Sequence, residues 1–117
     1  DLPEANILVN TSNDAWFGDS LAPHQHLQIA QMRSLETGRP MVRSTNTGQS
    51  AFIDYRGRLI STTGQFKAET LSAELQGRTG STPFLVFAQV QPWLALLILL
   101  LTLFLAFNRI PRLLAPR

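Results

Sequence analysis

Apolar residues form several short runs over residues 1–80 and one long run towards the carboxyl end. The run Asn6–Asn10 predicts a strand that is buried on both faces. The stretch 23–37 carries apolar residues at helical spacing and predicts a helix that Gly38 and Pro40 end. The predicted inward face of this helix holds Leu27, Ala30, Ser34 and Leu35, with Ile29, Met32 and Glu36 alongside.

The segment after this helix predicts further strands. Residues 41–44 read as a strand that leads into an Asn46-Thr47-Gly48 turn. Residues 50–55 and 59–62 flank Arg56-Gly57-Arg58, which is typical of a hairpin. Residues 69–75 alternate between polar and apolar and predict one more strand with a wet face. Residues 1–76 therefore predict a mixed α/β domain, with 77–83 as a linker.

The long apolar run predicts a transmembrane helix over residues 84–108. Residues 93–107 are almost pure hydrocarbon, and no charged residue lies between Arg78 and Arg109. A helix over 93–107 spans only about 22 Å, which is less than the roughly 30 Å of a bilayer core. A helix from Pro83 or Phe84 is about 36 Å long and can cross, whereas one from Pro92 that includes Ile110 is the alternative geometry. A buried helix of a soluble protein is disfavoured, because the rest of the chain is too polar to surround it.

The flanks of this run predict its orientation. Trp93 matches an aromatic belt, and the basic residues Arg109, Arg112 and Arg117 match a positive-inside flank. We therefore expect residues 109–117 to form a basic cytoplasmic tail and the α/β part to lie on the far side, which is the periplasm in a bacterium. The net charge of +2 is too small to indicate a nucleic-acid partner, and none is expected.

Cysteine is absent from the sequence, so this chain by itself supplies no disulfide, thiolate metal site or thiol nucleophile. The start, residues 1–4, has neither an initiator Met nor a signal peptide, and we interpret it as a cut end.

The candidate binding residues lie in the loop Ser12-Asn13-Asp14-Ala15-Trp16-Phe17-Gly18, which follows the first predicted strand. Ligands of open α/β sheets bind at the carboxyl ends of strands. Two large aromatic residues in such a loop either pack down locally or contact an apolar ligand. The residues alone slightly favour packing, and the nearby membrane helix favours a lipid-facing role.

Other polar residues are interpreted as structural. His24 and His26 point to different faces of a helix and have no evident third ligand, so no metal site is expected. Arg33 and Glu36 are spaced as an ion pair, and Arg43 in an apolar strand must find a carboxylate or carbonyl groups. No acid, base and nucleophile set can be assembled, so no catalytic residue is assigned to this chain.

Four collinear blocks resemble the apolipoprotein N-acyltransferases, from about Asn6 to the last helix. They are residues 12–20 (SNDAWFGDS), 23–30 (PHQHLQIA), 33–40 (RSLETGRP) and 43–48 (RSTNTG). A general nitrilase would share only the helix pattern around Ala30, Arg33 and Glu36 and the Asn-x-Gly turn. The resemblance implies that residues 1–76 are the carboxy-terminal part of a nitrilase-like α-β-β-α sandwich, followed by one transmembrane helix.

The resemblance also implies a chemistry. The family moves an acyl chain from a phospholipid to an active-site cysteine and then to the amino group of a lipidated apolipoprotein cysteine. The partners implied are a phospholipid donor, an apolipoprotein acceptor and membrane lipids, with no cofactor. The family's Cys, Lys and Glu precede the first strand of this chain, so we expect the fragment alone to be inactive.

By the resemblance, Ser12 and Asn13 end a strand near that cysteine, and Trp16, Phe17 and Gly18 form a mobile loop at the acyl-chain entrance above the bilayer. The implied location is the bacterial inner membrane, in a multi-pass protein. Two alternatives are a membrane-anchored nitrilase or amidase that hydrolyses C–N bonds, and a non-catalytic anchored binding module.

Overall fold

The computed structural model describes the backbone of residues 5–113 and the side chains of residues 5–107. The predicted cut end at residues 1–4, Arg117 and the side chains of Arg109 and Arg112 lie outside what is described. The chain divides into two units, Asp1–Thr82 and Pro83–Arg117. The first unit is mixed α/β, which confirms the predicted class, and the described part of the second is a single helix.

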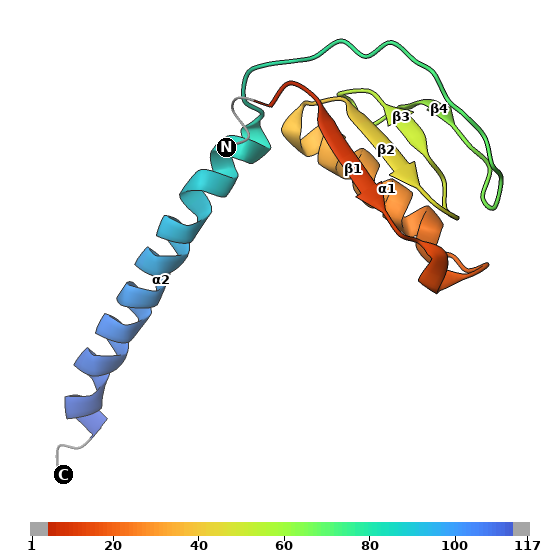
Figure 1. Ribbon diagram of the computed structural model, residues 1–117. Coiled ribbons are helices and arrows are strands. Elements are labelled where there is room, and N and C mark those ends of the chain that lie inside the picture. Colours follow the sequence, from red (N-terminus) through yellow and green to blue (C-terminus); the bar gives the residue numbers. More distant parts are fainter. Residues whose placement is uncertain (1–4, 114–117) are drawn as a thin grey trace. The chain divides into compact units, whose positions relative to one another are not determined.

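The first unit is built on a four-stranded sheet in the order β1-β2-β3-β4 (Figure 1). Its strands are β1 (Leu8–Ser12), β2 (Met41–Thr45), β3 (Ala51–Ile53) and β4 (Leu59–Thr62). β1 and β2 are parallel, with Ser12 opposite Thr45, and the other two pairs are antiparallel. A parallel pair needs a crossover, which is supplied here by the helix α1 (Ala22–Thr37). The carboxyl ends of β1 and β2 therefore meet at one edge of the sheet.

Helix α1 covers one face of the sheet, and the core lies between them (Figure 1). The buried apolar side chains are Leu27 and Ala30 of α1, Met41 of β2, and Ala51 and Ile53 of β3. Leu35, which we expected on the buried face, is half exposed. The buried residues of α1 lie within about 80° on one side of Leu27, whereas Leu35 lies about 80° on the other side. Gly38 ends α1 in the left-handed conformation at φ 64°, as its position predicts.

Two strand predictions need correction. The first strand begins at Leu8 and runs to Ser12, two residues later than the pattern 6–10 indicates. The predicted strand at residues 69–75 is wrong, because that segment forms no regular element and pairs with no strand of the described chain. Its alternation is nevertheless real, since Leu71, Ala73 and Leu75 are half-buried between exposed neighbours. Alternation reports contact on one side of the backbone, whereas a strand also needs a partner for its hydrogen bonds.

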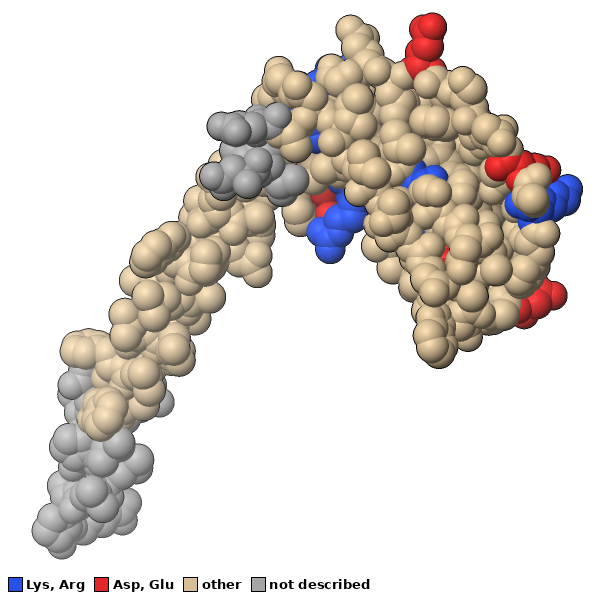
Figure 2. Space-filling model, in the orientation of Figure 1, with Lys and Arg blue, Asp and Glu red and all other residues tan. Residues whose placement is uncertain are grey.

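The second unit is helix α2 (Pro83–Leu113). It begins at Pro83, the earlier of the two starts that the sequence left open. Residues Pro83–Phe107 form one helix that is long and apolar enough to cross a membrane. The space-filling view shows no charged side chain on the visible face of the described part of α2 (Figure 2). The division into domain, linker, transmembrane helix and tail stays a prediction.

Candidate functional site

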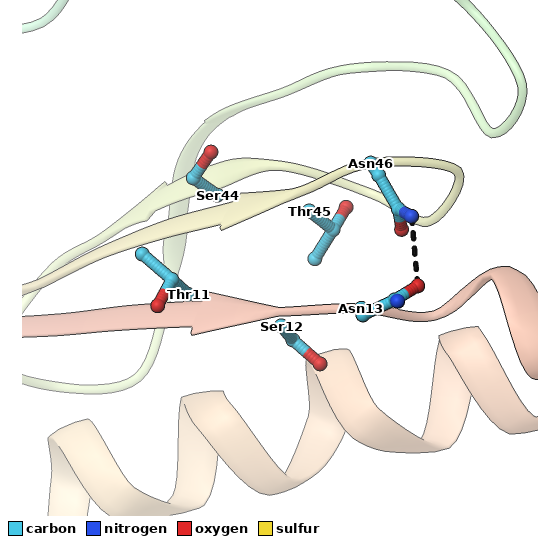
Figure 3. Close-up of a pocket in the computed structure, with 6 residues that line it drawn as sticks. All are labelled: Thr11, Ser12, Asn13, Ser44, Thr45 and Asn46. Atoms are coloured by element: carbon cyan, nitrogen blue, oxygen red, sulfur yellow. Dashed lines mark hydrogen bonds between the residues drawn. The ribbon is translucent and has the colours of Figure 1, made fainter.

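The candidate site lies where β1 and β2 end. Six polar residues there line an open cavity of about 490 Å³: Thr11, Ser12, Asn13, Ser44, Thr45 and Asn46 (Figure 3). The parallel pairing brings the two strand ends together, although 32 residues separate Asp14 from Asn46 in sequence. The close-up shows Asn13 and Asn46 pointing toward one another, with the Asn46 amide donating to Asn13 Oδ1 at 2.7 Å. This rim offers hydroxyl and amide groups that can bind a polar group of a substrate.

The loop that carries the aromatic residues begins directly beyond this rim. Ala15–Phe17 form the 3₁₀ turn η2. The Phe17 N–H donates to the Asp14 carbonyl at 3.1 Å, and the Ala15 N–H donates to Asn13 Oδ1 at 3.1 Å. Gly18 follows at φ 52°, a left-handed conformation that suits glycine. The loop is therefore an ordered turn at the sheet edge.

The two aromatic residues of the loop differ in their surroundings. Phe17 packs edge-on against the ring of His26, with ring centroids 4.8 Å apart. Trp16 has 86% of its surface exposed, so it does not pack down locally within the described chain. An exposed indole three residues beyond the cavity residue Asn13 is available to contact an apolar ligand.

Asp14 is buried under the loop and was not singled out from the sequence. Its carboxylate lies 2.9 Å from Arg43 Nη2 and accepts a hydrogen bond from the Ser12 hydroxyl at 2.7 Å. His26 Nδ1 is 3.3 Å from the same carboxylate. Burial raises the pKa of Asp14, but hydrogen bonds to Ser12 and His26 and the charge of Arg43 outweigh it, so the pKa lies below its usual value. Asp14 is thus an ionised acid held by three partners.

Gly48, which has no side chain, leaves the space that the Asp14 carboxylate occupies. A Cβ atom at Gly48 would lie 2.3 Å from Asp14 Oδ2, so a side chain there would collide with the carboxylate. The predicted Asn46-Thr47-Gly48 turn therefore reverses the chain and also positions Asp14. Asn46 Oδ1 accepts from the backbone N–H of Asp14 at 3.0 Å, and Gly48 leaves room for its side chain.

The five predicted site residues, which lie between Ser12 and Gly18, fall into two groups in the structure. Ser12 and Asn13 line the cavity, whereas Trp16, Phe17 and Gly18 belong to the turn beside it. The expected partner of Arg43 is confirmed to be a carboxylate, and the Arg33–Glu36 ion pair is present at 2.8 Å. His24 is exposed while His26 binds Asp14, so the two histidines diverge as expected.

Asp14 and Gly48 belong to this site, and the pattern did not assign either of them to it. The available signal was the need of Arg43 for an acid, together with Asp14 at the end of the neighbouring strand. Choosing Asp14 among the eight acidic residues of the chain requires knowing which strand lies beside β2.

The chain is similar to known proteins over most of its length. The sequence model described as Carbon-nitrogen hydrolase matches residues 1–84. A protein of Nitrosomonas europaea named apolipoprotein N-acyltransferase is 56% identical over 86 residues, 74% of this chain and 17% of that protein. A protein of the same name from Pasteurella multocida is 45% identical over 115 residues, 97% of this chain and 22% of its own length. A third, from Bordetella bronchiseptica, is 47% identical over 94% of this chain and 20% of its own length. The chain thus spans about a fifth of the curated relatives it matches.

Proposed function

This chain belongs to the carbon–nitrogen hydrolase family, and we propose that the protein carrying it is an apolipoprotein N-acyltransferase. One observation carries the proposal: the similarity to the proteins of that name extends over 97% of this chain in one case, and so through most of α2. The Carbon-nitrogen hydrolase match, by contrast, ends at residue 84. Similarity through the apolar helix favours the membrane acyltransferases over a hydrolase that merely carries an anchor.

The proposed reaction has two acyl-transfer steps. A cysteine thiolate attacks the ester carbonyl of a phospholipid, a C–S bond forms, the ester C–O bond breaks, and a lysophospholipid leaves after taking up a proton. The α-amino group of the lipidated apolipoprotein cysteine then attacks the thioester, an amide forms and the thiol is released. The 117-residue chain contains no cysteine, and the proposal therefore assigns the nucleophile to a part of the protein outside these residues.

Within this reaction, we assign the described residues to the wall of the binding site. Ser12 and Asn13 lie at the strand end, with Asn13 fixed by Asn46 at 2.7 Å, and offer polar groups near the reacting ester. Trp16 and Phe17 stand beside them at the acyl-chain entrance. The exposure of Trp16 supports this assignment, because a large apolar side chain left in water has surface to cover with a lipid chain.

The proposed setting is the bacterial inner membrane. The single helix long enough to cross, within the described residues, is Pro83–Phe107. The arginines at 109, 112 and 117 favour a cytoplasmic carboxyl terminus, which puts the α/β unit in the periplasm. The proposed partners are a phospholipid donor, a lipidated apolipoprotein and the surrounding lipids.

The test is the variant Trp16→Ala in a full-length enzyme that carries this segment. We expect thioester formation, transfer to a diacylated lipopeptide, or both, to slow by about tenfold, since a fully used aromatic contact contributes on the order of 1–2 kcal/mol. Mass spectrometry of the acyl-enzyme and of the lipopeptide product measures the two steps separately. Trp16→Phe should restore most of the rate, because it keeps an apolar ring.

Leu59→Ala is the matched control, because Leu59 is a partly exposed apolar residue of β4 outside the cavity. Its rates should equal those of the parent enzyme. Unchanged rates of both half-reactions in Trp16→Ala would remove the proposed role of the loop, and failure of the parent enzyme to acylate the lipopeptide would remove the proposed function.

A further inference from the structure

The loop that carries Trp16 is attached to the sheet through Asp14 at both the backbone and the side chain. The Asp14 carbonyl accepts the Phe17 N–H at 3.1 Å, and the Asp14 N–H donates to Asn46 Oδ1 at 3.0 Å. These two bonds fix where the turn η2 starts and how it closes. The position of Trp16 in the middle of η2 therefore depends on where Asp14 is held.

The side chain of Asp14 is held by groups from three different elements. Arg43 comes from β2, Ser12 from β1 and His26 from α1. The carboxylate is fully buried and the Arg43 side chain is 3% exposed. A buried charge pair with this many partners is costly to disrupt, because each group loses its compensation if the other moves. The partly exposed pair Arg33–Glu36 has no such constraint.

Asp14 also contacts the loop indirectly, through the imidazole ring of His26. His26 Nδ1 lies 3.3 Å from Asp14 Oδ1, and the same imidazole meets the Phe17 ring at an interplanar angle of 79°. Edge-to-face packing of this kind has a preferred geometry. Asp14 thus restrains the turn directly through the backbone and indirectly through His26 and Phe17.

We propose that Asp14 is a positioning residue for acyl transfer. Its carboxylate, locked between Arg43 and His26, holds the Trp16 turn in one place at the cavity rim, so that the indole meets the acyl chain without first being ordered. The kinetic part of this inference rests on the proposed function, whereas the structural part does not. Holding the turn in advance removes an entropic cost of binding.

The structural part is tested by hydrogen–deuterium exchange on a full-length enzyme that carries this segment. In Asp14→Asn we expect the amides of residues 13–18 to exchange at least about tenfold faster, because the turn opens locally. Peptides from the β3–β4 hairpin should keep the parent rate. A uniform increase in all peptides would mean that Asp14 only stabilises the fold, and that outcome overturns the proposal.

Asp54→Asn is the matched control, because Asp54 Oδ1 also organises a turn, accepting the N–H groups of Arg56 and Arg58 at 2.8 Å. This variant should loosen the hairpin and leave residues 13–18 and the acyl-transfer rates unchanged. Loosening of residues 13–18 in Asp54→Asn would show that any lost turn in the domain has this effect, and would count against a specific role of Asp14.

Two His26 variants keep the test decisive if Asp14→Asn does not fold. His26→Gln retains a group that can hydrogen-bond to Asp14 but loses the ring, and His26→Phe retains a ring but loses that bond. Both leave the buried Arg43–Asp14 pair in place. We expect each to raise exchange in residues 13–18 by a smaller factor than Asp14→Asn. Parent-like exchange in both variants overturns the proposal.

The kinetic part is tested by combining Asp14→Asn with Trp16→Ala. If Asp14 acts through Trp16, Asp14→Asn alone slows thioester formation by about threefold or more, and adds nothing in the Trp16→Ala background. Independent, multiplicative losses overturn the positioning role. Full activity of Trp16→Ala together with loosened exchange in Asp14→Asn would instead show that the proposed function of the loop is wrong while the structural attachment stands.

Discussion

Arg43 lies in β2, the second strand of the sheet, with its guanidinium almost completely buried. It donates to Asn10 Oδ1 at 2.7 Å and to Asp14 Oδ2 at 2.9 Å, so its charge is compensated by an acid of the segment that follows β1. Arg39 is buried as well, but its partners are the carbonyl oxygens of Ala5, Thr37 and Gly80. The same residue type thus serves two purposes: one arginine orients an acid at the cavity, and the other joins separate segments of backbone.

The depressed pKa of Asp14 predicts a pH dependence of stability. A carboxylate whose pKa is lower in the folded state than in the unfolded state stabilises the fold above its unfolded pKa of about 3.9. This contribution is lost as the pH falls through the folded pKa. The melting temperature of the α/β unit in the intact protein should therefore fall below about pH 4. Asp14→Asn removes the titrating carboxylate and should therefore flatten this acid limb.

Calorimetry from pH 3 to 7 measures both effects. Glu36→Gln serves as the control, because the pair Arg33–Glu36 is partly exposed and removing it should change the melting temperature little. An acid limb of unchanged height in Asp14→Asn would contradict the assignment to Asp14.

Among the elements, α1 and α2 both carry many apolar residues, but the burial of these residues differs between the two helices. The buried residues of α1 repeat at helical spacing because one face meets a sheet. The span of α2 from Pro83 to Phe107 contains no charged residue and is not buried by the rest of the described chain. At about 1.5 Å per residue it is long enough to cross a bilayer core. Its environment must therefore be lipid or other apolar helices.

Substitution in the centre of α2 tests this environment. Leu96→Arg places a charge near the middle of the span and should disfavour membrane insertion by about 2.5–3.5 kcal/mol. Phe84→Arg places the same side chain one residue from the start of the helix, where it can reach the interface, and should have a much smaller effect. A glycosylation reporter carrying α2 measures the inserted fraction. Equal insertion of the two variants would contradict a transmembrane position.

At the scale of the whole molecule, the chain consists of one α/β unit and one helix, joined at Thr82 and Pro83. Within the first unit, the Arg78 guanidinium lies 3.7 Å from the centroid of the Tyr55 ring, and Arg39 donates to the Gly80 carbonyl at 2.8 Å. These contacts attach the segment before α2 to the folded domain almost up to the helix. The segment 77–82 is therefore held against the α/β unit by these contacts.

The proposed orientation can be tested on the intact protein in cells. A fluorescent protein fused after Arg117 should fluoresce, and alkaline phosphatase at the same point should be inactive, because the basic flank favours the cytoplasm. Replacing the arginines at 109, 112 and 117 with Gln weakens this preference and serves as the comparison. An active phosphatase fusion to the unaltered protein would reverse the proposed topology.

The sequence by itself determined the features that depend on local order. Helical spacing and the stop at Gly38 define α1, strand patterns and an Arg-Gly-Arg turn define the hairpin, and an uncharged apolar run defines the candidate membrane span. These properties are readable because side-chain direction follows from backbone geometry at short range. The collinear blocks around Trp16 identified the family for the same reason, since they are a property of residue order.

Only the tertiary structure decided which residues from distant segments meet. The parallel pairing of β1 and β2 brings Asp14 to Arg43 and Asn13 to Asn46, and it makes Gly48 a point of close approach. The alternating segment 69–75 shows the reverse case, since its pattern is that of a strand but it pairs with no strand of the described chain. Pairing and burial are relations between segments, and the pattern of one segment does not contain the position of another.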